Sequence, residues 1–164
     1  MKSRLTFSNV VFVLLCLILL TAVPSSLRYA YHHGGFYLLS RQFLIDLPKR
    51  LNGPGRFRFI LQPAAAIFLG IRAGVADARI GRPPYIFGVV FDPRGRWALL
   101  KEGYRQISTL VAMGILLDAI SQFFILRAVY PGAAVVVGPV LIAIPYALSR
   151  AGANRWMRRR KAVS

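Results

Sequence analysis

Apolar residues are gathered into four long runs along the chain, separated by charged and turn-forming segments. The runs cover residues 5–23, 57–76, 107–126 and 129–148. A helix needs about 20 predominantly apolar residues to cross the hydrocarbon core of a bilayer, and each run is about that long. The pattern predicts an all-α integral membrane protein, a bundle of about four transmembrane helices in a single membrane domain over residues 1–164.

The first run has a second interpretation. Lys2 and Arg4 precede it and the small residues of Val23-Pro24-Ser25 follow it, as in a cleaved signal peptide. An Ala-x-Ala cleavage motif is absent, and the run is long enough to span. We therefore favour an uncleaved transmembrane helix over a signal peptide.

Two segments between the runs have the apolar periodicity of helices that lie in the membrane interface. In the predicted outer loop, 24–56, one face carries Phe36, Leu39, Phe43 and Leu47, and the other carries Ser40, Arg41, Gln42 and Asp46. In the predicted cytoplasmic loop, 77–106, a helix capped by Asp92-Pro93 places Trp97, Leu100, Tyr104 and Ile107 on one face and continues into the third run. The last two runs are so close that they form a tight hairpin, with Pro131 in the first turn of the final helix.

Composition narrows the class of protein. The chain is 56% hydrophobic, only 16% charged, and carries a net charge of +17 from 22 Lys+Arg against 5 Asp+Glu. Such an apolar composition excludes a disordered chain, and apolar runs of this length are not needed by a soluble nucleic-acid binder. The single cysteine and the adjacent pair His32-His33 supply no metal-ligand pattern.

Basic residues predict the orientation. If all four runs span and the N-terminus is cytoplasmic, fourteen Lys and Arg fall inside and seven outside, which agrees with the positive-inside rule. Both termini, including the basic tail 149–164, are then cytoplasmic. The seven outer basic residues, most of them in the loop 24–56, are not explained by orientation.

The cytoplasmic loop begins with a cluster of charges: Arg72, Asp77, Arg79 and Arg82. Asp77 is within sequence reach of the three arginines, and Pro83-Pro84 then prevents the helix from continuing. One interpretation is a site for a phosphate-bearing ligand or lipid headgroup. The favoured one is an ion pair that orders the loop beside residues that set the orientation.

This segment, together with Tyr85 and with the later stretch Leu117-Asp118-Ala119-Ile120-x-Gln122, resembles a group of small uncharacterised polytopic inner-membrane proteins of bacteria. The resemblance extends over residues 57–155. It implies a bacterial inner-membrane location and brings no activity with it.

Asp118 is the only acidic residue inside a predicted span, and an ionisable group at membrane depth is expensive to bury. Gln122 and Ser121 adjoin it on the helix, and Gln62 lies at the same depth as Gln122 and is expected to hydrogen-bond to it. A protonated Asp118 would donate to a backbone carbonyl, whereas an ionised one needs a cation, for which Arg72 is the nearest candidate. We favour a polar clamp that fixes helix register over a proton- or ion-coordinating transport site.

Motifs of catalysis are absent from the sequence: no Gly-rich phosphate loop, no G-x-S-x-G and no H-E-x-x-H. We expect no cofactor and no metal. The sequence favours a non-enzymatic accessory, assembly or structural subunit that contacts anionic lipid headgroups, with a membrane-protein partner or further copies of itself and no nucleic acid. A small oligomeric transporter or channel built around Asp118 is the alternative, and a lipid-headgroup enzyme using the four charges of the cytoplasmic loop is a third, weaker option.

Overall fold

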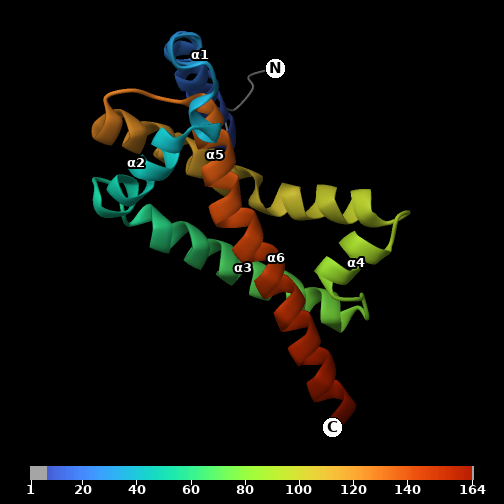
Figure 1. The fold of residues 1–164 in the computed structure, drawn as a ribbon. Coiled ribbons are helices and arrows are strands. Elements are labelled where there is room, and N and C mark those ends of the chain that lie inside the picture. The colour runs from blue at the N-terminus through green and yellow to red at the C-terminus, as the bar shows by residue number, and fades with distance from the viewer. Residues whose placement is uncertain (1–6, 164) are drawn as a thin grey trace. The chain divides into compact units, whose positions relative to one another are not determined.

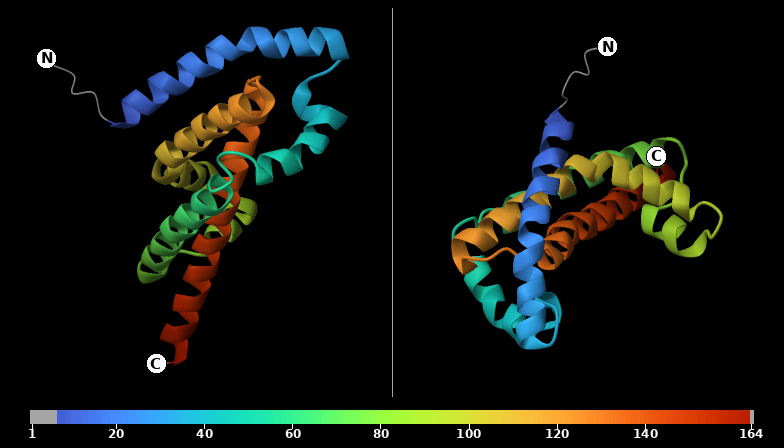
Figure 2. Two further views of the ribbon diagram at one scale, coloured as in Figure 1. Left: turned by 90° about the vertical axis from the view of Figure 1, so that its left-hand side faces the viewer. Right: turned by 90° about the horizontal axis from the view of Figure 1, so that it is seen from above.

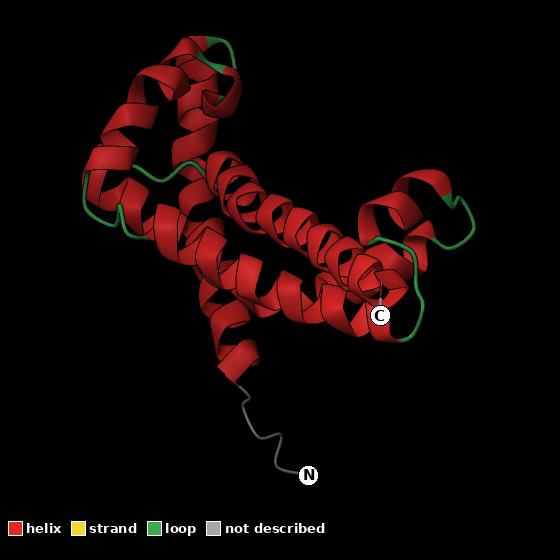
Figure 3. Cartoon of the chain, turned by 90° about the horizontal axis from the view of Figure 1, so that it is seen from below, coloured by secondary structure: helices red, strands yellow, loops and turns green. Residues whose placement is uncertain are grey.

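The computed structural model describes residues 7–163, and within them the chain is all-α, with no strand (Figure 1, Figure 3). The elements in chain order are α1 (Phe7–His33), a short 3₁₀ helix η1 (Tyr37–Leu39), α2 (Arg41–Asn52), α3 (Arg58–Arg79), α4 (Tyr85–Phe91), α5 (Arg96–Leu126) and α6 (Pro131–Val163). The predicted fold class is confirmed.

Four helices, α1, α3, α5 and α6, are long and apolar enough to cross a membrane. They coincide with the four predicted runs, although residues 5 and 6 of the first run, with Lys2 and Arg4, lie outside the described residues. The helices extend well beyond the runs, because a helix ends at a stop signal and not where its sequence turns polar. α1 continues to His33 and stops before Gly34, whose φ of 67° is the left-handed conformation of a helix C-terminus.

The same effect shortens the predicted loops. The outer loop begins within α1 and holds η1 and α2, and the last third of the cytoplasmic loop is the first part of α5. The basic tail is helical through Val163 as part of α6. Figure 2 shows α5 and α6 as long continuous helices.

The chain forms two compact units, residues 1–60 with 111–140 and residues 61–110 with 141–164. The first unit contains α1, η1, α2 and the hairpin made by the end of α5 and the start of α6. The second contains α4, most of α3, the start of α5 and the rest of α6.

The hairpin of the first unit has the predicted turn, with Pro131 as the first residue of α6. A Cβ atom added at Gly138 would lie 2.8 Å from the backbone nitrogen of Ile115 and 2.9 Å from the carbonyl carbon of Gly114. Only glycine permits this approach, so the contact fixes how the two helices pack. Ala134 is buried on the same side of α6.

The amphipathic prediction for the outer loop is right about a helix and only partly right about its faces, because Phe36 and Leu39 precede α2 and are exposed. α2 begins after Ser40, whose hydroxyl accepts a hydrogen bond from the backbone N–H of Phe43. Phe43 and Leu47, from the predicted apolar face, are half-buried, but Asp46, from the predicted polar face, is buried on the same side together with Arg50. Arg50 pairs there with Asp118 and Asp46 accepts a hydrogen bond from Tyr37, and apolar periodicity carries no information about either contact.

In the second unit, α3 ends at Arg79, before Pro83-Pro84, which were predicted to stop the helix, and the short helix α4, which was not predicted, begins directly after them. The helix predicted to follow Asp92-Pro93 starts three residues later, at Arg96. Asp92 Oδ1 instead accepts hydrogen bonds from the backbone N–H groups of Arg94 and Gly95, at 3.1 and 3.0 Å, and so caps the turn that leads into α5.

Candidate functional site: two buried ion-pair clusters

Asp118 is the centre of the first cluster, which we call the Asp118 cluster and which consists of Asp118, Gln122, Arg50 and Arg58. An oxygen of the carboxylate, Oδ1, lies 2.8 Å from Nη2 of Arg58, and Oδ2 lies 3.6 Å from Nη1 of Arg50. The three charged side chains are 3% exposed or less. This geometry makes Asp118 the centre of a buried ion-pair cluster, with one guanidinium group facing each carboxylate oxygen.

Gln122 joins this centre to the hairpin turn. Its Nε2 donates to Asp118 Oδ2 at 2.6 Å, and its Oε1 accepts a hydrogen bond of 2.7 Å from the backbone N–H of Tyr130. The predicted pairing of Asp118 with Gln122 on one face of the helix is confirmed. Because one amide bridges the carboxylate and the turn, the cluster fixes the C-terminal end of α5.

The other two predicted members have different surroundings. Ser121 is buried and lies against Gly55, where an added Cβ would be 2.5 Å from its hydroxyl oxygen. Gln62 is buried, and neither polar atom of its side chain has a hydrogen-bond partner among residues 7–163. The hydrogen bond expected between Gln62, in the second unit, and Gln122, in the first, stays a prediction, and within the first unit Asp118 and Tyr130 bind the polar atoms of Gln122.

The cluster carries two positive charges against one negative charge, and aromatic rings lie next to both guanidinium groups. The guanidinium of Arg50 lies 5.4 Å from the ring centre of Phe43 and 5.9 Å from that of Tyr37. Arg58 lies 4.6 Å from the ring of Phe59 and donates to the carbonyl of Leu117 at 3.3 Å. Cation–π contacts of desolvated arginines are worth roughly 2 kcal/mol, which offsets part of the cost of the second charge.

Asp46, on the same buried face of α2 as Arg50, belongs to an adjoining group. Its carboxylate accepts hydrogen bonds from Lys49 at 2.8 Å, Gln42 at 3.0 Å and Tyr37 at 3.0 Å. Burial alone would raise the pKa of Asp46, but these three donors outweigh it and hold the pKa below its ordinary value. Burial also raises the pKa of the Tyr37 hydroxyl, against the lowering effect of Arg50.

Sequence reasoning missed both cationic partners of Asp118. Arg50 lies in the predicted outer loop, 24–56, and Arg58 is the second residue of the predicted span 57–76, where neither is expected to reach Asp118. In the structure both are buried, and Arg72, the predicted candidate, is exposed and in no ion pair with any described residue. The one signal was the excess of basic residues in the outer loop, which orientation did not explain.

The second cluster, the Arg150 cluster, is made by Arg150, Asp77, Glu102, Arg82 and Tyr146. Arg150 Nε lies 2.6 Å from Asp77 Oδ2 and its Nη2 lies 3.0 Å from Asp77 Oδ1, a two-pronged pair in which Arg150 is fully buried. Glu102 accepts from Arg150 at 2.9 Å and pairs with Arg82 at 2.9 Å. Two carboxylates and two guanidinium groups therefore alternate in one network.

Tyrosines and a glycine complete the surroundings of Arg150. Its Nη1 donates to the hydroxyl of Tyr146 at 2.9 Å, and that hydroxyl donates to Gln106 at 2.8 Å. The guanidinium lies 4.4 Å from the ring centre of Tyr85. At Gly74 an added Cβ would collide with the backbone carbonyl of Arg150, so glycine is what lets α3 and α6 approach closely enough for the pair.

Of the four charges predicted to act together in the cytoplasmic loop, the structure joins two. Asp77 lies 3.7 Å from Arg82, as the sequence allowed, but Arg72 and Arg79 are exposed and form no ion pair with the described residues. The principal partner of Asp77 is Arg150, which was assigned to the basic tail. The pair is 73 residues apart in the chain, a separation that local spacing does not address.

All five acidic side chains of the chain are thus engaged within it. Asp46, Asp77, Glu102 and Asp118 are in ion pairs, and Asp92 caps a turn. Among the described residues no three His, Cys, Asp or Glu side chains are grouped in a way that could hold a metal ion. The two clusters are arranged to hold helices together, and the carboxylates in them are paired with arginines of the same chain.

Comparison with known proteins found no matching family model, no matching curated protein and no matching solved structure.

Proposed function

We propose that this chain is a small multi-pass membrane protein that acts by contact and not by catalysis, as an accessory, assembly or structural subunit. The observation that carries the proposal is the internal use of every acidic side chain. General acid–base catalysis and ion coordination both need a polar group that can reach a ligand, and Asp118 is only 1% exposed.

The basic residues support contact with anionic partners. Lys49, Arg50, Arg58, Arg82 and Arg150 are in ion pairs, while the other basic side chains among residues 7–163 are in none. A Lys or Arg near an anionic membrane surface contributes about 1 kcal/mol of attraction. Anionic lipid headgroups, or acidic segments of a membrane partner, match this surplus.

Location and orientation follow from the same features. The resemblance over residues 57–155 and the distribution of basic residues favour a bacterial inner membrane with both termini in the cytoplasm. Three of the seven outer basic residues, Lys49, Arg50 and Arg58, are in ion pairs with Asp46 or Asp118. These three have a structural role besides any effect on orientation.

Purification of the full chain from its native membrane in a mild detergent tests the proposal. We expect a second membrane protein to co-purify in a fixed ratio, and to remain with an Arg72→Gln variant, which alters an exposed charge outside both clusters. Recovery of the chain as an isolated monomer would contradict an accessory role. A homo-oligomer whose ion conductance or uptake is lost in Asp118→Asn would establish the transport alternative instead.

A further inference from the structure

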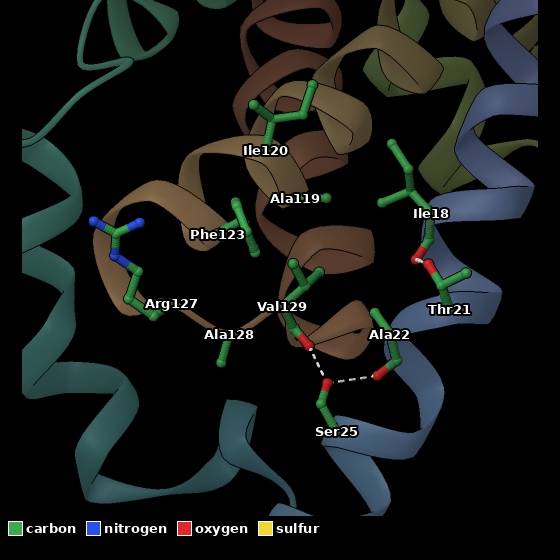
Figure 4. Close-up of a pocket in the computed structure, with 10 residues that line it drawn as sticks. All are labelled: Ile18, Thr21, Ala22, Ser25, Ala119, Ile120, Phe123, Arg127, Ala128 and Val129. Carbon is green, nitrogen blue, oxygen red and sulfur yellow. Dashed lines mark hydrogen bonds between the residues drawn. The ribbon is translucent and has the colours of Figure 1, made fainter.

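An apolar groove within the first unit has no role in either ion-pair cluster. It has a volume of about 450 Å³ and lies between α1 and the end of α5 with the hairpin turn (Figure 4). Its walls are Ile18, Thr21, Ala22, Ser25, Ala119, Ile120, Phe123, Arg127, Ala128 and Val129. Grooves of this volume are typical of sites for small apolar ligands.

The two hydroxyl groups in the walls are already satisfied. The hydroxyl of Thr21 donates to the carbonyls of Leu17 and Ile18, and that of Ser25 donates to the carbonyls of Ala22 and Val129. Figure 4 shows the Ser25 bonds at one end of the groove, where they tie α1 to the hairpin turn. With no hydrogen bond left to offer along its length, the groove suits a hydrocarbon chain and not a polar molecule.

The length of the groove matches one leaflet. From Arg127 at the end of α5 to Ala119 the helix rises about 12 Å, compared with about 15 Å for half of the hydrocarbon core. The walls run from the hairpin turn, at the edge of the predicted span, toward its middle. An acyl chain entering from the headgroup region fits this direction and depth.

Arg127 is one of the residues that line the groove, at its hairpin-turn end. Arg127 is exposed, and Figure 4 shows its guanidinium on the side of the hairpin away from α1. Arg28, one helical turn beyond Ser25, is exposed as well, and neither arginine is in an ion pair with any described residue. Both side chains are long and flexible enough to turn toward a phosphate at the mouth.

The backbone of Arg127 supports a role for its side chain. Its φ of 55° is the only positive value among the described non-glycine residues. This left-handed conformation at a helix C-terminus is normally given to glycine or asparagine, because it strains residues with a Cβ. An arginine therefore stands where glycine would fit without strain, and its side chain is the part that the backbone geometry does not explain.

We propose that the groove holds one acyl chain of an anionic phospholipid, whose phosphate lies between Arg127 and Arg28. This inference rests on the membrane location in the proposed function but not on the accessory role. The lipid site can therefore be disproved while the accessory role stands, and the reverse. The proposed lipid would also be a ligand for Arg28 and Arg127, two of the outer basic residues that orientation does not explain.

Native mass spectrometry of the full chain, released from detergent with added lipid, tests the site. Probes are phosphatidylglycerol, phosphatidylcholine with the same acyl chains, and inorganic phosphate. We expect one retained phosphatidylglycerol, weaker retention of phosphatidylcholine, and no retained phosphate. Arg127→Gln should weaken phosphatidylglycerol binding about fivefold, the equivalent of about 1 kcal/mol, and Arg41→Gln, at another exposed arginine, should leave it unchanged.

Two further variants separate the groove from the fold. Ala22→Leu fills the groove and should reduce the retention of both lipids, whereas Val23→Leu, at the exposed neighbouring position, should not. Arg127→Gly removes the guanidinium and the backbone strain together, so it should lose phosphatidylglycerol while melting in lipid-free detergent at the same or a higher temperature. Equal phosphatidylglycerol retention by wild type, Arg127→Gln and Ala22→Leu, or a second protein chain in place of lipid, would overturn the proposal.

Discussion

Replacing Asp77 by asparagine leaves Arg150 buried and deprived of its two-pronged partner. Removing one member of a buried ion pair costs about 3 to 5 kcal/mol, because the other charge stays desolvated. Here the hydrogen bonds lost are those of 2.6 and 3.0 Å, while Glu102 at 2.9 Å and the ring of Tyr85 at 4.4 Å remain. We therefore expect the lower end, about 3 kcal/mol of unfolding free energy or a little more than a hundredfold in the equilibrium constant.

The chain supplies its own reporters and control for this measurement. Both tryptophans, Trp97 and Trp156, lie in the second unit with the Arg150 cluster, so their fluorescence follows the unfolding of that unit in detergent as denaturant is added. Arg79→Gln removes an exposed charge and should change the free energy by no more than about 0.5 kcal/mol. If Asp77→Asn unfolds at the same denaturant concentration as Arg79→Gln, the assignment of Arg150 to Asp77 is refuted.

Other predictions follow from packing and charge. Gly138→Ala should destabilise the hairpin by about 1 to 3 kcal/mol, because the added Cβ meets the α5 backbone. Gly132→Ala should not, because no atom lies within 4 Å of the added Cβ. Equal stability of the two variants in thermal melts would contradict the close approach of Gly138 to α5. The lowered pKa of Asp46 means that this group stabilises the fold above its unfolded pKa of about 3.9 and loses that contribution as pH falls through its folded pKa. The free energies of unfolding of wild type and Asp46→Asn should therefore differ near neutral pH and converge as the pH falls through the lowered pKa of Asp46, and a difference that stays constant down to the acid end of the titration would contradict the lowered pKa.

Hydrophobic patterning predicted the four long helices because crossing a bilayer imposes a length and composition that a sequence displays directly. Pro83-Pro84 and Pro131 marked element boundaries for an equally local reason. The burial of Arg50 and Arg58 beside Asp118 could not be predicted from the residues next to them in the sequence. Whether an arginine lies at the headgroups or deep beside a carboxylate depends on how a loop folds against a distant helix.

In the candidate site too, contacts between sequence neighbours were predictable and contacts between distant residues were not. Asp118 with Gln122, one turn apart, and Asp77 with Arg82, five residues apart, were predictable as neighbours in the sequence. Arg150 joins Asp77 only because α6 passes α3, and a glycine at position 74 leaves the space. For Arg50 and Arg58, the partners of Asp118, the one sign in the sequence was the excess of outer basic residues that orientation did not explain.

The central claim is that the acid at membrane depth is a structural ion pair, and a double-mutant cycle between Asp118 and Arg58 tests it most directly. All variants carry Arg50→Met, so that Arg58 is the only cation left beside Asp118. The cycle then compares Asp118→Asn, Arg58→Gln and the two changes together. The account predicts that each single change is strongly destabilising and that the double variant recovers at least about 1 kcal/mol of their sum. Additive effects, within about 0.5 kcal/mol, would contradict a structural ion pair between Asp118 and Arg58.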